Sequence, residues 1–109
     1  MNGVEWISGN VFIRPNTLEK TGDGVAGHAH NFDHTTIIFT GKVHVKAKLP
    51  DGTIREADFE APSHFLVRAG VEHEIKALED NTVFWCVYSH RDPQGKIHQE
   101  YTGWEKSNN

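Results

Sequence analysis

The chain has 109 residues, of which 37% are hydrophobic and 24% are charged, a size and composition typical of one soluble folded domain. The formal net charge of −4 argues against a nucleic-acid surface, and no apolar run approaches the roughly 20 residues needed to span a bilayer. The first ten residues lack a signal-peptide pattern, and the single cysteine, Cys86, excludes an intrachain disulfide, so we expect a cytoplasmic protein.

Short apolar runs separated by Gly, Pro, Asn and Asp predict strands and turns rather than helices. The runs expected to form strands are Val11–Ile13, Thr35–Thr40, Lys42–Leu49, Ile54–Phe59, Phe65–Val67 and Val83–Tyr88. Within 42–49 the residues alternate strictly, and Pro50-Asp51-Gly52 after it predicts a hairpin turn. About eight short strands at roughly 8–12-residue spacing predict an all-β sandwich or barrel. We expect the polar tail, residues 104–109, to be frayed, with Trp104 able to contact the body.

Eight histidines are the most informative feature of the composition. His28, His30 and His34 form the pattern H-x-H-x-x-x-H. Residues two apart in a strand point to the same face, so His28 and His30 can reach one metal ion, and His34 keeps this parity if the strand continues. Imidazole nitrogens bind divalent first-row metals at about 2.0–2.1 Å, which requires convergent side chains. The alternative is a row of surface histidines on an exposed strand face.

These histidines lie between two glycines. Gly22 and Gly41 complete the string G-x5-H-x-H-x3-H-x6-G over residues 22–41. This string resembles the first conserved motif of the cupin superfamily, G-x5-H-x-H-x3,4-E-x6-G, with His34 in place of the usual glutamate.

Residues 62–77 resemble the second cupin motif, G-x5-P-x-G-x2-H-x3-N, with Gly70 and His73 in register. Pro62, Arg68 and Ala77 stand where the motif has Gly, Pro and Asn. An alternative role for His73 is a turn histidine that contacts a backbone carbonyl.

The resemblance implies a single cupin domain over residues 1–109, an all-β double-stranded β-helix or jelly-roll barrel. It implies that one divalent transition metal (Fe, Mn, Ni, Zn or Cu) binds to four histidines inside the barrel, namely His28, His30, His34 and His73. Small cupins commonly dimerise, and a lone barrel has edge strands to protect, so we expect a homodimer.

Several further side chains are candidates for the wall of a cavity in such a barrel: Phe39, His64, Phe84, Trp85 and Cys86. A structural role is the alternative for His64, and a small buried hydrophobe is the alternative for Cys86. For Trp85 the alternative is a core position on the other face of the sheet. Three other histidines are expected at the surface: His44, His90 and His98.

Two classes of function follow from the resemblance. One is a metalloenzyme that acts on a small organic molecule, with an oxygenase-type reaction first and isomerase, lyase or decarboxylase chemistry as rivals. The other is a non-catalytic barrel that binds a small ligand or a metal. The sequence identifies no second catalytic acid or base near the motif, so the reaction and the substrate stay open.

Overall fold

The structure, a computed structural model, describes residues 5–97, and all regular secondary structure in that range is β-strand. The Ala26 and His28 side chains, residue His98 and the tail at 104–109 with Trp104 lie outside the described part. The strands are β1 (Trp6–Ser8), β2 (Val11–Leu18), β3 (Gly24–His28), β4 (His34–Thr40), β5 (Lys42–Lys48), β6 (Ile54–Glu60), β7 (Ser63–Val67), β8 (Glu72–Ala77) and β9 (Thr82–Ser89). The described residues contain no helix that is long and apolar enough to cross a membrane.

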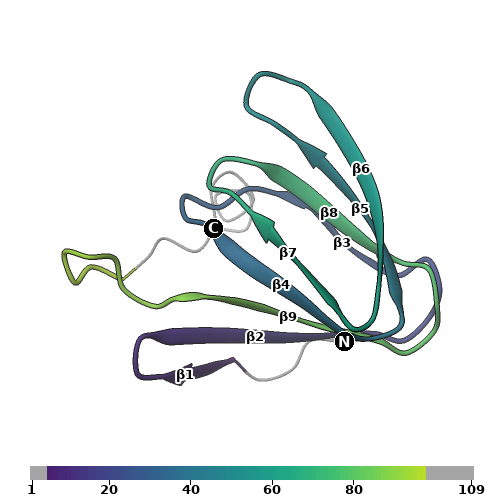
Figure 1. Ribbon diagram of the computed structural model, residues 1–109, viewed down its shortest axis with the longest axis horizontal. Helices are drawn as coiled ribbons and strands as arrows, with labels where there is room; N and C mark the ends of the chain where they lie inside the picture. The colour runs from purple at the N-terminus through teal and green to yellow at the C-terminus, as the bar shows by residue number, and fades with distance from the viewer. Residues whose placement is uncertain (1–4, 98–109) are drawn as a thin grey trace.

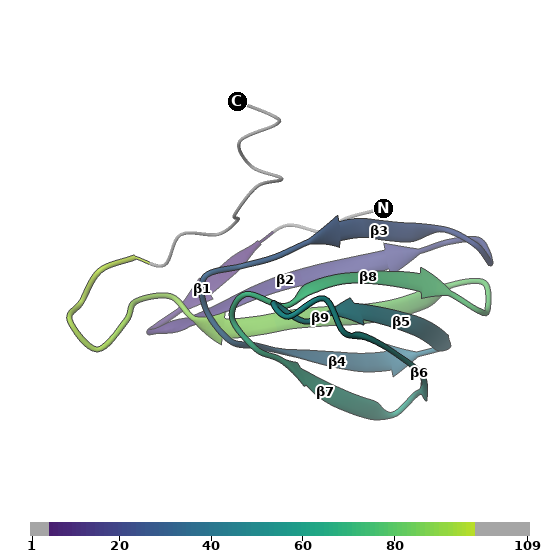
Figure 2. The same cartoon turned by 90° about the horizontal axis from the view of Figure 1, so that it is seen from above.

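The strands form two antiparallel sheets that face each other. The five-stranded sheet has the order β1-β2-β9-β4-β7, and the four-stranded sheet has the order β3-β8-β5-β6. The β5–β6 hairpin and the β1–β2 hairpin lie at opposite sides of the molecule (Figure 1). The segment after β9 extends away from both sheets (Figure 2). This arrangement confirms the predicted all-β jelly roll.

The core lies between the sheets because alternate residues of most strands point inward. In β4, for example, His34, Thr36 and Ile38 are buried, whereas the intervening residues are partly or fully exposed. The main hydrophobic cluster contains Leu18, Ile38, Val43, Val45, Ile75, Ala77 and Phe84. A second cluster of Phe12, Phe32 and Tyr88 lies beside the histidines of the first motif.

Three glycines of the two motifs adopt positive φ angles, which L side chains rarely adopt. The φ angles are +96° at Gly22, +84° at Gly41 and +82° at Gly70. Gly41 is the single residue between β4 and β5, so it makes the turn that passes the chain from one sheet to the other. Gly41 therefore ends β4 in a tight turn.

The run that carries the first three histidines is interrupted, which corrects the idea of one continuous strand. β3 ends at His28 in the four-stranded sheet, and β4 begins at His34 in the five-stranded sheet. Residues 29–33 cross between the sheets. The parity argument therefore does not extend from His28 to His34.

β2 also differs from the prediction, since it runs through Pro15 instead of ending before it. β1 pairs only with Val11–Ile13, so the side of β2 next to Pro15 is a sheet edge. A proline is tolerated at an edge because no ladder partner there needs its missing N–H.

Candidate metal centre

Three histidines from different parts of the chain meet between the two sheets. His30 comes from the 29–33 crossing, His34 from the start of β4 and His73 from β8. Their exposed fractions are 7%, 3% and 3%. The ring centroids are 4.8 Å apart for His30–His34, 5.5 Å for His30–His73 and 5.1 Å for His34–His73. One ligand atom from each ring lies within 4.8 Å of the others.

The crossing that carries His30 is fixed by contacts with the turn before β8. The Gly70 N–H donates to the His30 carbonyl at 2.8 Å, and the Ala69 N–H donates to Asp33 Oδ1 at 2.7 Å. Phe32 in the same crossing is 4% exposed and packs its ring 4.2 Å from that of Tyr88. The two sequence motifs are thus joined directly through backbone and side-chain contacts.

A backbone contact sets the tautomer of His73. Its Nδ1 lies 3.2 Å from the Val71 carbonyl oxygen, which can only accept a hydrogen bond. Nδ1 therefore carries the proton, and Nε2 has the lone pair that a metal ion needs. Contacts of this kind orient metal-binding histidines and make them more basic.

The geometry and the chemistry of these side chains fit a transition-metal ion. Two imidazole nitrogens bound to one ion lie about 3 to 3.4 Å apart in tetrahedral or octahedral geometry, so small ring rotations close the observed spacing. The donors are imidazoles alone, which suit Fe, Ni, Cu and Zn better than Mg or Ca. The three histidines could therefore hold a transition metal.

His28, the fourth predicted ligand, is placed by its backbone alone. It pairs with His73 in the ladder between β3 and β8. Its membership of the ligand set stays a prediction.

A cavity of about 740 Å³ opens beside the histidines and has His73 in its wall. Its other lining residues are Val45, Ala47, Leu49, Arg55, Glu56, Ala57, Phe59, Phe65, Leu66, Val67, Arg68 and Val71. The wall therefore comes from β5 to β8 and the turns beside them. Its volume lies in the range typical of small-molecule sites.

None of the side chains proposed from the sequence for a cavity wall is among the residues that line the 740 Å³ cavity. Phe39 and Trp85 contact each other at 4.8 Å on the outer face of the five-stranded sheet, and His64 is exposed on the same face. Phe84 is 1% exposed in the hydrophobic core. Cys86 is on the inner face beside Thr36, at 3.7 Å from its hydroxyl. Burial raises the pKa of the Cys86 thiol, which makes it a poor nucleophile.

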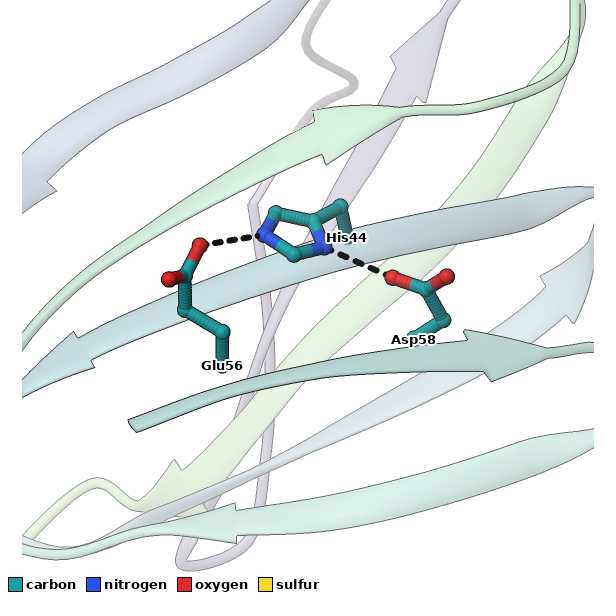
Figure 3. A network of polar contacts seen from close by, with 3 residues as sticks. All are labelled: His44, Glu56 and Asp58. Carbon is teal, nitrogen blue, oxygen red and sulfur yellow. Dashed lines mark hydrogen bonds and ion pairs between the residues drawn. The ribbon is translucent and has the colours of Figure 1, made fainter. Parts of the chain in front are cut away.

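The remaining described histidines lie away from this cluster. His44, on the outer face of β5, contacts Asp58 Oδ1 through Nδ1 at 2.6 Å and Glu56 Oε1 through Nε2 at 2.8 Å (Figure 3). These hydrogen bonds, that of Asp58 first, raise the pKa of His44. His90, expected at the surface, is half-buried and stacks on Phe12 with a centroid distance of 6.0 Å.

Comparison with solved structures identifies the architecture. A cupin superfamily protein from Desulfitobacterium hafniense superimposes with a TM-score of 0.67 at 16% identity, over 82% of this chain and 75% of that chain. The chain has the cupin fold. An oxalate decarboxylase variant from Bacillus subtilis gives a TM-score of 0.71 at 19% identity, and the Lactobacillus farciminis oxalate decarboxylase gives 0.62 at 22%.

The superposition covers 86% of this chain for the Bacillus protein and 79% for the Lactobacillus protein. The chain spans only 24% and 30% of the length of those two decarboxylases. No protein-family model and no curated protein matches the chain. The likeness therefore establishes the fold, and function rests on the residues of the site.

Proposed function

We propose that this chain is a metal-dependent protein that binds one divalent transition-metal ion through His30, His34 and His73, with His28 as a fourth ligand. The convergence of three buried imidazoles, with ligand atoms within 4.8 Å of one another, carries this proposal. One metal ion could bind a nitrogen atom of each of the three rings at once. The pairing of His28 with His73 in the β3–β8 ladder supports the fourth position.

The function that the site supports best is an oxygenase-type reaction on a small organic molecule. Bound iron or manganese would supply redox and Lewis-acid chemistry. The chain would hold the ion at the inner wall of the cavity and orient His73 through the Val71 carbonyl. A cupin lyase such as a decarboxylase is the second candidate, favoured by the likeness to oxalate decarboxylases.

The open cavity favours an enzyme or a ligand-binding site over a purely structural metal, because a structural site is usually closed by protein side chains. The test is anaerobic reconstitution with Fe(II) or Mn(II), followed by oxygen uptake on a panel of small diketones, phenols and thiols, and by CO2 release from small organic acids. His73→Ala serves as the matched inactive variant. Oxygen uptake that needs metal and His73 supports the oxygenase, and CO2 release without oxygen uptake supports the lyase. Neither activity in a fully loaded protein would contradict both.

We also propose that the chain forms a homodimer through the outer face of the five-stranded sheet. One row across that face contains Trp6, Ile13, Val87, Thr35 and Leu66, in register from β1 to β7. Trp6 is 51% exposed and Leu66 is 53% exposed. Exposed apolar faces of this kind usually mark an interface.

The outer face of the four-stranded sheet has the opposite character. It carries alternating charges, with Lys42 opposite Glu60 and Lys46 opposite Glu56 and Glu74. This face is suited to water, so the apolar face is the one suited to a second copy. Native mass spectrometry should detect a dimer that Leu66→Glu converts to a monomer while Lys46→Glu does not. A wild-type monomer would contradict the proposal.

A further inference from the structure

The cavity beside the histidines has an apolar body. Phe59 of β6 and Phe65 of β7 stack across the junction of the two sheets, with ring centroids 4.6 Å apart at an angle of 29°. Val45 and Ala47 of β5 face the same space, as does Val67 at the end of β7. Such walls accept a hydrocarbon or aromatic group.

Two arginines give this apolar space a positive charge. Arg55 shares the inner face of β6 with Ala57 and Phe59, because it pairs with Ala47 of β5. Arg68 follows β7 and also lines the cavity. Within residues 5–97, neither guanidinium forms a hydrogen bond or an ion pair.

The acidic groups nearest Arg55 in the sequence make their hydrogen bonds with other partners. Glu56 borders the cavity, but its carboxylate contacts His44 on the outer face of the sheet (Figure 3). The Asp51 carboxylate accepts a hydrogen bond from the Thr53 N–H at 2.9 Å. The Arg55 guanidinium also helps to lower the pKa of Asp51, although the two groups form no ion pair. Within residues 5–97, the cavity therefore presents two guanidinium groups that form no hydrogen bond or ion pair with a carboxylate.

We propose that the cavity binds a small organic acid, with its carboxylate on Arg55 and Arg68 and its apolar body against Phe59 and Phe65. Guanidinium groups bind carboxylates through paired, charge-assisted hydrogen bonds. Arg55 and Arg68 are both exposed, so a ligand can reach them from solvent. Arg55 and His73 both pair with Ala47 and so lie in one row of the four-stranded sheet, which makes the carboxylate the end of the acid nearer His73. This inference rests on the proposed function only where it makes the acid a substrate of the metal centre, since binding itself needs no metal.

The experiment is calorimetric titration of chelator-treated, metal-free protein with 3-phenylpropanoate and with 3-phenylpropanamide, its neutral counterpart of the same shape. We expect the acid to bind at least about tenfold more tightly than the amide, a difference of about 1.4 kcal/mol. Arg55→Gln and Arg68→Gln should each reduce this preference, and the double variant should abolish it. Lys76→Gln on the outer face of β8 removes the same charge and should leave the preference unchanged. Phe59→Leu should weaken both ligands equally.

Equal affinity for acid and amide, no binding of the acid, or full preference in the double arginine variant would each overturn the inference. Metal content is measured separately in the same preparations before chelation and after reloading. A protein that binds the acid but never binds metal contradicts the proposed function and leaves this inference intact. A protein that binds metal but shows no preference for the acid contradicts this inference and leaves the proposed function intact.

Discussion

Replacing Gly41 by alanine should destabilise the protein more than an alanine substitution at any other turn glycine within residues 5–97. At a φ of +84°, an L residue pays roughly 1–2 kcal/mol in backbone strain. Its Cβ would also overlap Thr82 Oγ1 and lie 2.9 Å from Thr82 Cα. Thr82 is fully buried at the start of β9, so relieving this overlap costs about 1–3 kcal/mol more. The sum is a loss of about 2–5 kcal/mol in the free energy of unfolding.

Two other glycines separate these contributions. Gly52 has a φ of +90°, and no atom lies within 4 Å of the position that a Cβ would occupy, so Gly52→Ala should show the strain alone. Gly24 has no positive φ, and its Cβ would lie 2.6 Å from the Ile75 carbonyl oxygen, so Gly24→Ala should show the steric cost alone. Urea unfolding followed by tryptophan fluorescence measures all three. If Gly41→Ala costs no more than Gly52→Ala, the close approach of β9 to this turn is refuted.

Two further predictions concern histidines. His34→Glu should keep the metal, because it restores the usual carboxylate of the motif. It should also make the metal-loaded site one charge less positive, so the reduction potential of bound iron should be lower than in the wild type. Because the pKa of His44 is raised in the folded state, its protonated form stabilises the fold below about pH 6.5, and this stabilisation is lost as the pH rises through the raised pKa. His44→Gln should therefore lower stability most at acidic pH, with His64→Gln as the exposed control; a pH-independent difference would contradict this.

The predictable parts of the fold are those in which local pattern and turn chemistry agree. Residues 42–49 alternate strictly and lead into a turn with Gly52, which has a φ of +90°, and they form one arm of the β5–β6 hairpin. Extending the alternation through that turn places Arg55 and Phe59 on the inner face with Val45. The alternation along the hairpin therefore predicts which residues of β5 and β6 face the cavity. The histidine motifs alone do not predict them.

Other features depend on contacts between distant segments. Nothing local to the run from His28 to His34 shows that the chain leaves one sheet and enters the other, because this is fixed by hydrogen bonds to the turn at residues 69–70. Trp85 and Phe84 are adjacent apolar residues on opposite faces of β9. Hydrophobicity alone cannot separate an inner from an outer face when both are apolar, so the sequence pattern leaves open which face Trp85 lies on, and the structure has it on the outer face.

The central claim is that three buried histidines form a metal site, and anaerobic calorimetric titration with Co(II) tests it most directly. We expect one ion per chain in the wild type. We expect the affinity to fall by about tenfold or more in His30→Ala, His34→Ala and His73→Ala, each shown to be folded by circular dichroism. His64→Ala, on the outer face, should bind as the wild type does. No Co(II) binding by the wild type, or wild-type affinity in the three cluster variants, would contradict the account.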